Sequence, residues 1–467
     1  MYRYSSFARL LQGSYAGHRM ALRTSLSRRV QLRPIRSDAS SHASSPPSSA
    51  PGSSPPSGAG RAQQRGFTSA AVADSSVGGR TAAGESATAS EGTTTTSNSS
   101  GGWGGGWVRP GFEKPVGWWL LASSGCVFGM VTIGGYTRLS KSGLSMTDWK
   151  FEGRPLPSTE DEWNVEFDKY KVTPEYTQIN YGMTLDEFKY IYFVEWFHRM
   201  AGRFTGVVFG TGLAYFLLRG ALRPPLLIRL AGLFAFGAMQ GGIGWWMVKS
   251  GLTEPTTQLK TPRVSPYRLA THLTMAFALY AGCLWTSLTL LRPLPETVHP
   301  TQAMVQAARR LRGFSAPLAA LLGITLVSGA FVAGNDAGRA YNTWPKMLDD
   351  WVPPEVFETL RGGLIRNVFE STPVVQFDHR LLAYATLAST AGLFLTARSL
   401  PVSPAVKFAA HLLPAAAFGQ VLLGIATLMM YVPVDLGVAH QAGGMLLLSA
   451  LVLYLHTLRV PLLPAVV

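Results

Sequence analysis

Four histidines of this 467-residue chain stand where they could act together. His198, His272, His379 and His440 each lie near the beginning of the second or the fourth apolar stretch in one half of the chain. Stretches that cross a membrane in the same direction begin at the same membrane face, so we expect all four imidazoles at that face. A lone histidine in an apolar helix is usually a packing residue, but four at matching positions indicate a functional site.

Paired imidazoles point to one kind of chemistry. Two neutral imidazoles that face each other across a helical bundle can supply both axial ligands of a heme iron. Zinc fits less well, because no Cys, Asp or Glu completes a tetrahedral set in both halves. A proton relay would not need the same pair twice. The spacing therefore predicts two bis-histidine heme sites.

Charged residues accompany two of these histidines. Arg199, Arg203 and Arg380 follow them at the membrane edge, where heme propionates need cationic partners. Simple interfacial snorkelling would place arginines there as well, and both interpretations stay open.

A carboxylate marks one half only. Glu195 precedes His198 by three residues and shares its helical face, whereas Gln376 holds the matching position before His379. A carboxylate beside a heme edge could position water or move protons, so Glu195 is the candidate catalytic residue. Its structural alternative is an ion pair with Arg199 or Arg203.

The elements that must position these residues are membrane helices. Charged residues make up 14% of the chain, against roughly 25% in soluble domains. Eight stretches approach the roughly 20 apolar residues that a bilayer requires. They are 116–136, 193–218, 226–248, 267–291, 314–334, 376–397, 408–431 and 438–458. The sequence predicts an all-α membrane protein with eight transmembrane helices as two tandem four-helix bundles.

Matching intervals indicate an internal duplication. A tryptophan follows a glycine-led triplet after 15 residues in both halves, from Gly134 to Trp149 and from Gly329 to Trp344. The His-Arg pair precedes a glutamine by 42 residues in the first half and by 41 in the second, and each glutamine has a glycine four residues later. Two parallel four-helix repeats explain these intervals.

The remaining segments complete the domain organisation. Residues 1–65 hold ten arginines, one acid and no lysine, which is typical of a mitochondrial transit peptide, and they carry +9 of the net charge of +15. The charge thus gives no reason to expect nucleic acid as a partner. We expect 66–109 to be a disordered low-complexity segment, 110–292 the first repeat, 293–313 a matrix linker and 314–467 the second repeat.

The charges of the short loops predict an orientation. Most of their arginines fall on connections from even to odd helices, which places that face and the N-terminus in the matrix. Lys249, Lys260, Arg263 and Arg268 lie on the opposite side and count against it. The acidic long loops, 137–190 and 335–375, and the heme sites would then face the intermembrane space.

Three motifs make the chain similar to a known family. GGYTRLSKSGLS from Gly134 to Ser145, EWFHR from Glu195 to Arg199, and the segment from Ala333-Gly334 through NTWP at Asn342 to Pro345 resemble the motifs of the heme A synthases. The resemblance extends over about 115–460.

That resemblance implies an oxidoreductase of two similar four-helix bundles, which oxidises a methyl group of heme O to the formyl group of heme A for cytochrome c oxidase biogenesis. It implies that His198 and His272 face the substrate heme O, that His379 and His440 bind a heme b cofactor with its iron, and that Glu195 belongs to the substrate half. It is also compatible with an electron donor such as ferredoxin, with heme O synthase as a partner and with a homo-oligomer in membrane lipid.

Two other classes of protein share some of these features. A bis-histidine diheme electron-transfer cytochrome would use the same ligands, but it profits from hemes near opposite membrane faces. A transporter with parallel repeats would explain the duplication but not four matched histidines. Some bacterial heme A synthases carry a cysteine pair in the first long loop, whereas Cys126 and Cys283 here lie in apolar stretches and are expected to be core residues.

Overall fold

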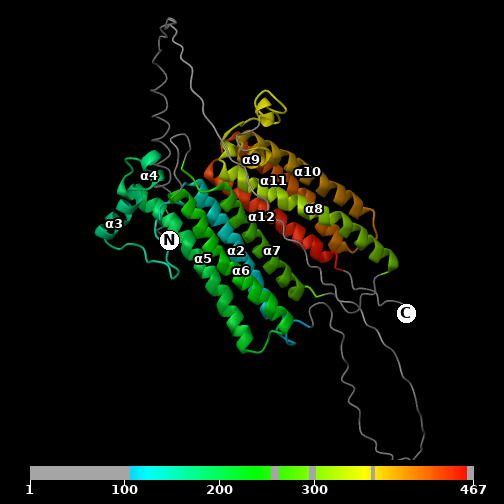
Figure 1. Ribbon diagram of the computed structural model, residues 1–467. Coiled ribbons are helices and arrows are strands. Elements are labelled where there is room, and N and C mark those ends of the chain that lie inside the picture. The colour runs from blue at the N-terminus through cyan, green and yellow to red at the C-terminus, as the bar shows by residue number, and fades with distance from the viewer. Residues whose placement is uncertain (1–105, 254–261, 294–300, 359–362, 460–467) are drawn as a thin grey trace, which may run out of the picture. The chain divides into compact units, whose positions relative to one another are not determined.

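Long helices dominate the computed structural model, which describes residues 106–253, 262–293, 301–358 and 363–459. Eight of them are long and apolar enough to cross a membrane, and each contains most or all of one predicted stretch (Figure 1). They are α2 (Glu113–Leu139), α5 (Leu185–Leu218), α6 (Pro224–Thr253), α7 (Pro266–Leu291), α8 (Gln302–Gly334), α10 (Thr372–Arg398), α11 (Pro404–Met429) and α12 (Val434–Thr457). The predicted all-α membrane fold is confirmed. The predicted transit peptide and almost all of the low-complexity segment lie outside the described residues.

Two helices, α5 and α8, begin eight or more residues before their apolar stretches. The hydroxyl of Thr184 accepts a hydrogen bond from the backbone N–H of Glu187, and the Glu187 carboxylate binds back to Thr184, which starts α5 at Leu185. The hydroxyl of Thr301 likewise accepts from Met304 and starts α8 at Gln302. Residues 302–313 of the expected linker are therefore helical.

The helices pack as two groups of four. In the first repeat α2 packs on α5 and α7, and α6 lies against α5 and α7; in the second, α10 and α12 flank α11, and α8 packs on α10 and α12 (Figure 1). Contacts between the groups join α2 to α12, α8 to α7, and α7 to α12. Exchanging the two repeats maps these three contacts onto themselves, as an approximate two-fold axis would do.

Both repeats share apolar and polar contacts at this interface. Met445 and Val452 of α12 belong to the buried core of the first repeat. The amide of Gln441 donates to the Val131 carbonyl at 2.8 Å. The guanidinium of Arg138, at the end of α2, donates across the interface to the Ala333 carbonyl at 3.0 Å.

The two long loops contain short helices of their own. The first holds α3 (Glu160–Lys171) and α4 (Pro174–Gln178), and the second holds η1 (Ala337–Arg339), η2 (Pro354–Phe357) and α9 (Leu364–Glu370). Phe167 and Tyr170 of α3 pack with Phe188 and Tyr192 of α5 in a buried aromatic cluster. The first loop is thus folded onto the beginning of α5, next to His198.

Candidate heme-binding sites

The structure brings the two histidines of the second repeat close together. His379 lies on α10 and His440 on α12, with their ring centroids 6.4 Å apart and their planes at 84°. Two imidazoles that bind one metal atom from opposite sides have metal–nitrogen bonds of about 2 Å, so their centroids lie roughly 6 Å apart. The separation fits a bis-histidine heme iron.

A glycine lies against each of the four imidazoles. A Cβ atom built on that glycine would stand 3.3 Å or less from Cε1 of the ring, which is closer than side chains normally approach. The pairs are Gly134 with His198 (3.1 Å), Gly244 with His272 (3.3 Å), Gly329 with His379 (3.2 Å) and Gly424 with His440 (2.8 Å). The first partner in each pair lies near the end of an odd-numbered span and the second near the beginning of an even-numbered span, so these contacts place all four rings at one membrane face.

The second ring nitrogens have different neighbours in the two repeats. Nδ1 of His379 lies 2.7 Å from the Ser328 hydroxyl, and Nδ1 of His440 lies 3.1 Å from the Gln420 amide nitrogen. Nδ1 of His198 and Nδ1 of His272 are buried, and neither forms a hydrogen bond within the described residues. When Nε2 of His379 binds iron, Nδ1 carries the proton and the Ser328 oxygen can accept it. The Gln420 amide nitrogen is a donor, so Nδ1 of His440 accepts from it instead.

The side chains at the site suit a heme iron, most of whose ligands come from the porphyrin, better than a bare metal ion. Within residues 106–253, 262–293, 301–358 and 363–459, no three His, Cys, Asp or Glu side chains gather closely enough to hold a bare metal ion. A heme iron needs only two ligands from the protein. The paired imidazoles, each with a glycine cradle, fit that group.

The two arginines that follow His198 bind backbone carbonyls of the first long loop. Arg199 donates to the carbonyl of Asp148 at 2.8 Å and to that of Met146 at 3.0 Å. Arg203, one turn later, donates to the carbonyls of Lys150 and Phe151. The pair fastens a strip of chain, 146–151, along the middle of α5.

Arg380 repeats this arrangement in the second loop. It donates to the carbonyls of Tyr341 at 2.8 Å and Thr343 at 2.9 Å, which have the same two-residue spacing as the carbonyls bound by Arg199. The structure thus gives all three arginines a loop-fastening role. Their role as propionate partners stays a prediction.

Glu195 is buried, with 2% of its surface exposed, and faces the same strip of the first loop. Its carboxylate accepts hydrogen bonds from the Ser145 hydroxyl at 2.7 Å, the Met146 N–H at 2.8 Å and the Arg199 guanidinium at 2.7 Å. The ion pair with Arg199, the structural alternative for Glu195, is therefore present. Its catalytic role stays a prediction.

Gln376 makes the complementary set of contacts in the second repeat. Its amide N–H groups donate to the carbonyls of Ala337, at 2.8 Å, and Ala340, and its amide oxygen accepts from Arg380 at 3.2 Å. The first loop therefore offers hydrogen-bond donors to a carboxylate, whereas the second loop offers acceptors to an amide. The polarity of each loop explains which of the two residues it can hold.

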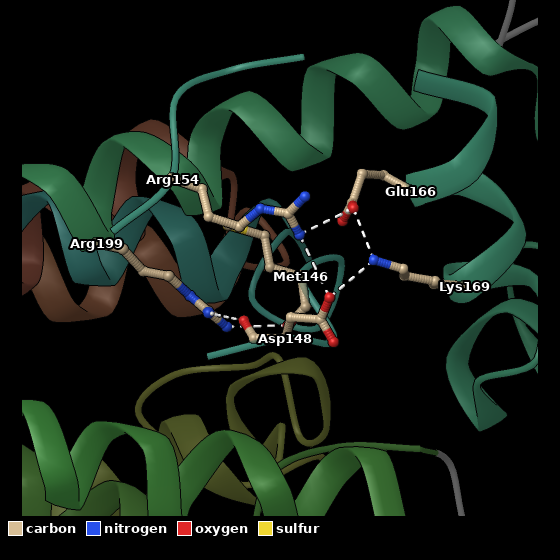
Figure 2. Close-up of polar contacts among 6 residues, drawn as sticks. All are labelled: Met146, Asp148, Arg154, Glu166, Lys169 and Arg199. Atoms are coloured by element: carbon tan, nitrogen blue, oxygen red, sulfur yellow. Dashed lines mark hydrogen bonds and ion pairs between the residues drawn. The ribbon is translucent and has the colours of Figure 1, made fainter. Parts of the chain in front are cut away.

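Ion pairs hold the first loop together above α5. Arg154 and Lys169 each bind both Asp148 and the buried Glu166, over distances of 2.8–3.3 Å (Figure 2). The hydrogen bond from Lys169 is the largest contribution that holds the pKa of Asp148 below its usual value, and the same contact raises the pKa of Lys169. Figure 2 shows Arg199 reaching the Met146–Asp148 backbone beside this cluster. The strip beside His198 is thus fastened on two sides.

Comparison with known proteins confirms the resemblance. Residues 117–452 match the COX15-CtaA family, described as cytochrome oxidase assembly protein. The chain belongs to this family. Heme A synthase COX15 of Arabidopsis thaliana is 51% identical over 352 residues, which cover 75% of this chain and 76% of the relative. The human Heme A synthase COX15 is 44% identical over 349 residues, which cover 74% of this chain and 83% of the human protein. Heme A synthase of Nitrosospira multiformis is 43% identical over 349 residues, 74% of this chain and 94% of its own.

The matched region takes in every site residue of this COX15-CtaA chain. It begins inside α2 and ends inside α12, so it contains all four histidines and both loops. Cys126 and Cys283 are free, and Cys283 is buried.

Sequence reasoning missed two features of the site. The first feature is the contact between each histidine and a glycine. The sequence reasoning used these four glycines only to align the repeats, although their matched positions in both halves were the available signal for the contacts. Glu175 of α4 is the second feature: burial, the largest cause, raises its pKa to about 7, and the nearby Glu195 adds to the shift. Nothing in the local sequence distinguishes this acid from its exposed neighbours.

Proposed function

We propose that the chain is a heme A synthase, which oxidises a methyl group of heme O to the formyl group of heme A. Family membership supports this activity, and the single structural observation that carries it is the matched set of four imidazoles, each against a glycine, at one membrane face. A transmembrane diheme electron carrier would profit from sites near opposite faces, so this observation favours the enzyme.

The two repeats divide the work. We assign a resident heme b to His379 and His440, whose ring separation of 6.4 Å suits one iron, and the substrate heme O to His198 and His272. When bound, heme b would supply the electron-transfer chemistry. The protein's own contribution is to fix both rings of the pair and to keep the loop strips in place beside them.

Glu195 is the residue we propose for proton handling in the substrate repeat. It lies three residues, or about one turn, before His198 on α5, and three hydrogen bonds fix its carboxylate. Oxidation of a methyl group to a formyl group requires proton transfer, and a fixed carboxylate beside the heme edge can position water or pass protons to and from the site. The hydroxyl of Ser145 donates to the Glu195 carboxylate and is the next group along which a proton could move.

Histidine substitutions in the full-length protein test this division. His379→Ala or His440→Ala should remove the resident heme spectrum, whereas His198→Ala should retain it and lose the conversion of heme O to heme A. The conversion is measured by extracting hemes from cells in which each variant replaces the wild-type protein. A full heme b spectrum in both second-repeat variants would contradict the assignment.

The proposed location is the mitochondrial inner membrane, with the N-terminus in the matrix and the heme sites towards the intermembrane space. The excess of Lys and Arg on the short even-to-odd loops supports this orientation. An electron donor such as ferredoxin, the heme O synthase and a second copy of the chain are the partners we propose. Protease added to mitoplasts should cut 137–190 and 335–375; cleavage only in 293–313 would invert the orientation.

A further inference from the structure

The hydroxyl of Ser328 is placed to fix the protonation state of His379. It donates its own hydrogen to the Thr325 carbonyl at 2.8 Å and lies 2.7 Å from Nδ1 of His379. A serine hydroxyl has one hydrogen, so its donation to the Thr325 carbonyl leaves the oxygen to accept from a protonated Nδ1 of His379. That tautomer leaves the lone pair on Nε2, the nitrogen that a heme iron binds.

Among the described residues of the first repeat, no hydroxyl contacts Nδ1 of His198. Gly134 lies against His198 at 3.1 Å in the way that Gly329 lies against His379 at 3.2 Å, so the residues preceding the two glycines occupy matching positions. The residue before Gly329 is Ser328, and the residue before Gly134 is Ile133. Nδ1 of His198 is buried and has no hydrogen-bond partner in the described part of the chain.

The proposed reaction makes different demands on the two sites. A cofactor heme has to stay bound through many turnovers, whereas a substrate heme has to enter and its product has to leave. A hydrogen bond from Nδ1–H to an acceptor orients a metal-bound imidazole and makes it a stronger donor, and loss of such a partner typically weakens metal binding 10–100-fold. The residue before the first histidine-contacting glycine of each repeat, Ser328 or Ile133, is therefore suited to set how tightly that repeat binds its heme.

We propose that Ser328 is a positioning residue that keeps His379 bound to a resident heme, and that Ile133 at the matching position leaves the heme of the first repeat free to exchange. This inference rests on the proposed assignment of the two sites. It makes the repeats functionally different through one hydroxyl group in the shell around the ligands.

Heme release from the purified full-length protein tests the proposal. Ser328→Ala should transfer its resident heme to excess apomyoglobin about tenfold faster than the wild type. It should also raise the reduction potential of that heme, because a weaker imidazole donor stabilises the ferric state less. Ser328→Thr, which restores a hydroxyl, should return both values towards those of the wild type.

A matched control lies on the same helix. Ser315 of α8 is buried and its hydroxyl binds the Leu311 carbonyl, 13 residues or about 20 Å along the helix from Ser328. Ser315→Ala removes a buried serine hydroxyl without touching His379, so it should leave heme release and potential unchanged. If Ser315→Ala changes both as much as Ser328→Ala does, the effect is not specific and the proposal is overturned.

The reciprocal change provides an independent arm. Ile133→Ser offers an acceptor to His198 and should slow heme release from the first repeat several-fold, with the resident heme unaffected. Failure of the site assignment is distinguishable, since the His379→Ala variant would then keep its resident heme. If His379→Ala loses the heme but Ser328→Ala releases it at the wild-type rate and potential, the assignment stands and the role of Ser328 is wrong.

Discussion

The two repeats place their histidines with the same scaffold but surround them with different chemistry. Arg199 and Arg380 hold their loops through carbonyls with the same spacing, and a glycine lies against every imidazole. Two of the differences are Glu195 in place of Gln376 and Ile133 in place of Ser328. After duplication, the framework that sets ligand geometry was kept, while the residues that handle protons next to the ligands diverged.

The largest effect should come from filling the glycine cradles one repeat at a time. Gly424→Leu would drive a side chain into the His440 ring, which already lies 2.8 Å from a Cβ position, and should abolish resident heme. Gly244→Leu should keep that heme but stop heme A formation. Absorbance of the purified variants and extracted hemes measure the two outcomes.

Gly419 offers a control on α11, because a Cβ there meets nothing within 4 Å. Gly419→Leu should keep both resident heme and activity. Wild-type heme content in Gly424→Leu would show that the glycine contact does not position His440.

A reciprocal swap should have an intermediate effect. Gln376→Glu would set a buried carboxylate against the carbonyls of Ala337 and Ala340, at a cost above the roughly 1–3 kcal/mol of a neutral unsatisfied group, and should lower the melting temperature. Glu195→Gln would turn an amide N–H₂ towards donors on Ser145 or Arg199, and should retain resident heme while heme A production falls. An unchanged melting temperature in Gln376→Glu would refute the opposite polarity of the loops.

The smallest effect concerns pH and belongs to the first loop. The pKa of Glu175 is about 7 in the folded protein against an ordinary value of 4.5. Between pH 4.5 and about 7, Glu175 is therefore protonated in the folded loop and ionised in the unfolded loop. Its contribution to stability is complete below about pH 4.5 and is lost as the pH rises through about 7. The protection of backbone amides in 174–180 against hydrogen exchange, relative to the intrinsic exchange rate, should therefore fall as the pH rises over that interval.

Glu175→Gln stays neutral and should remove this pH dependence. Glu162, whose pKa is lowered by hydrogen bonds from Ser158, titrates below the same interval, so Glu162→Gln should leave the dependence in place. A Glu175→Gln variant with the wild-type pH profile would assign the effect to another group.

Local sequence patterns predicted the membrane-spanning helices and the shared face of the histidines. Eight apolar stretches and the matched spacing of His198 and His379 are visible along the chain, and they correspond to eight helices and to one shared membrane face. The early start of α5 was also encoded, since Thr184 and Glu187 form a capping box that the apolar pattern alone overlooks.

Features that depend on tertiary contacts could not be predicted in this way. Ser328 touches His379 from a neighbouring helix, 51 residues away in sequence, and the spacing of hydroxyl residues gives no indication of that contact. The burial of Glu175 likewise depends on how the loop folds onto α5. The residues around Arg199, Arg203 and Arg380 left propionate binding and interfacial snorkelling both open, whereas in the structure all three donate to loop carbonyls.

The approximate two-fold relation between the repeats has a consequence for how such a protein can evolve. Two separate copies of one four-helix unit could assemble through the same three helix contacts, but every substitution would then appear in both subunits at once. A serine that retains a cofactor would also trap the product in the other copy. Joining the copies in one polypeptide removes that constraint, so retention and release can be selected independently at positions 328 and 133.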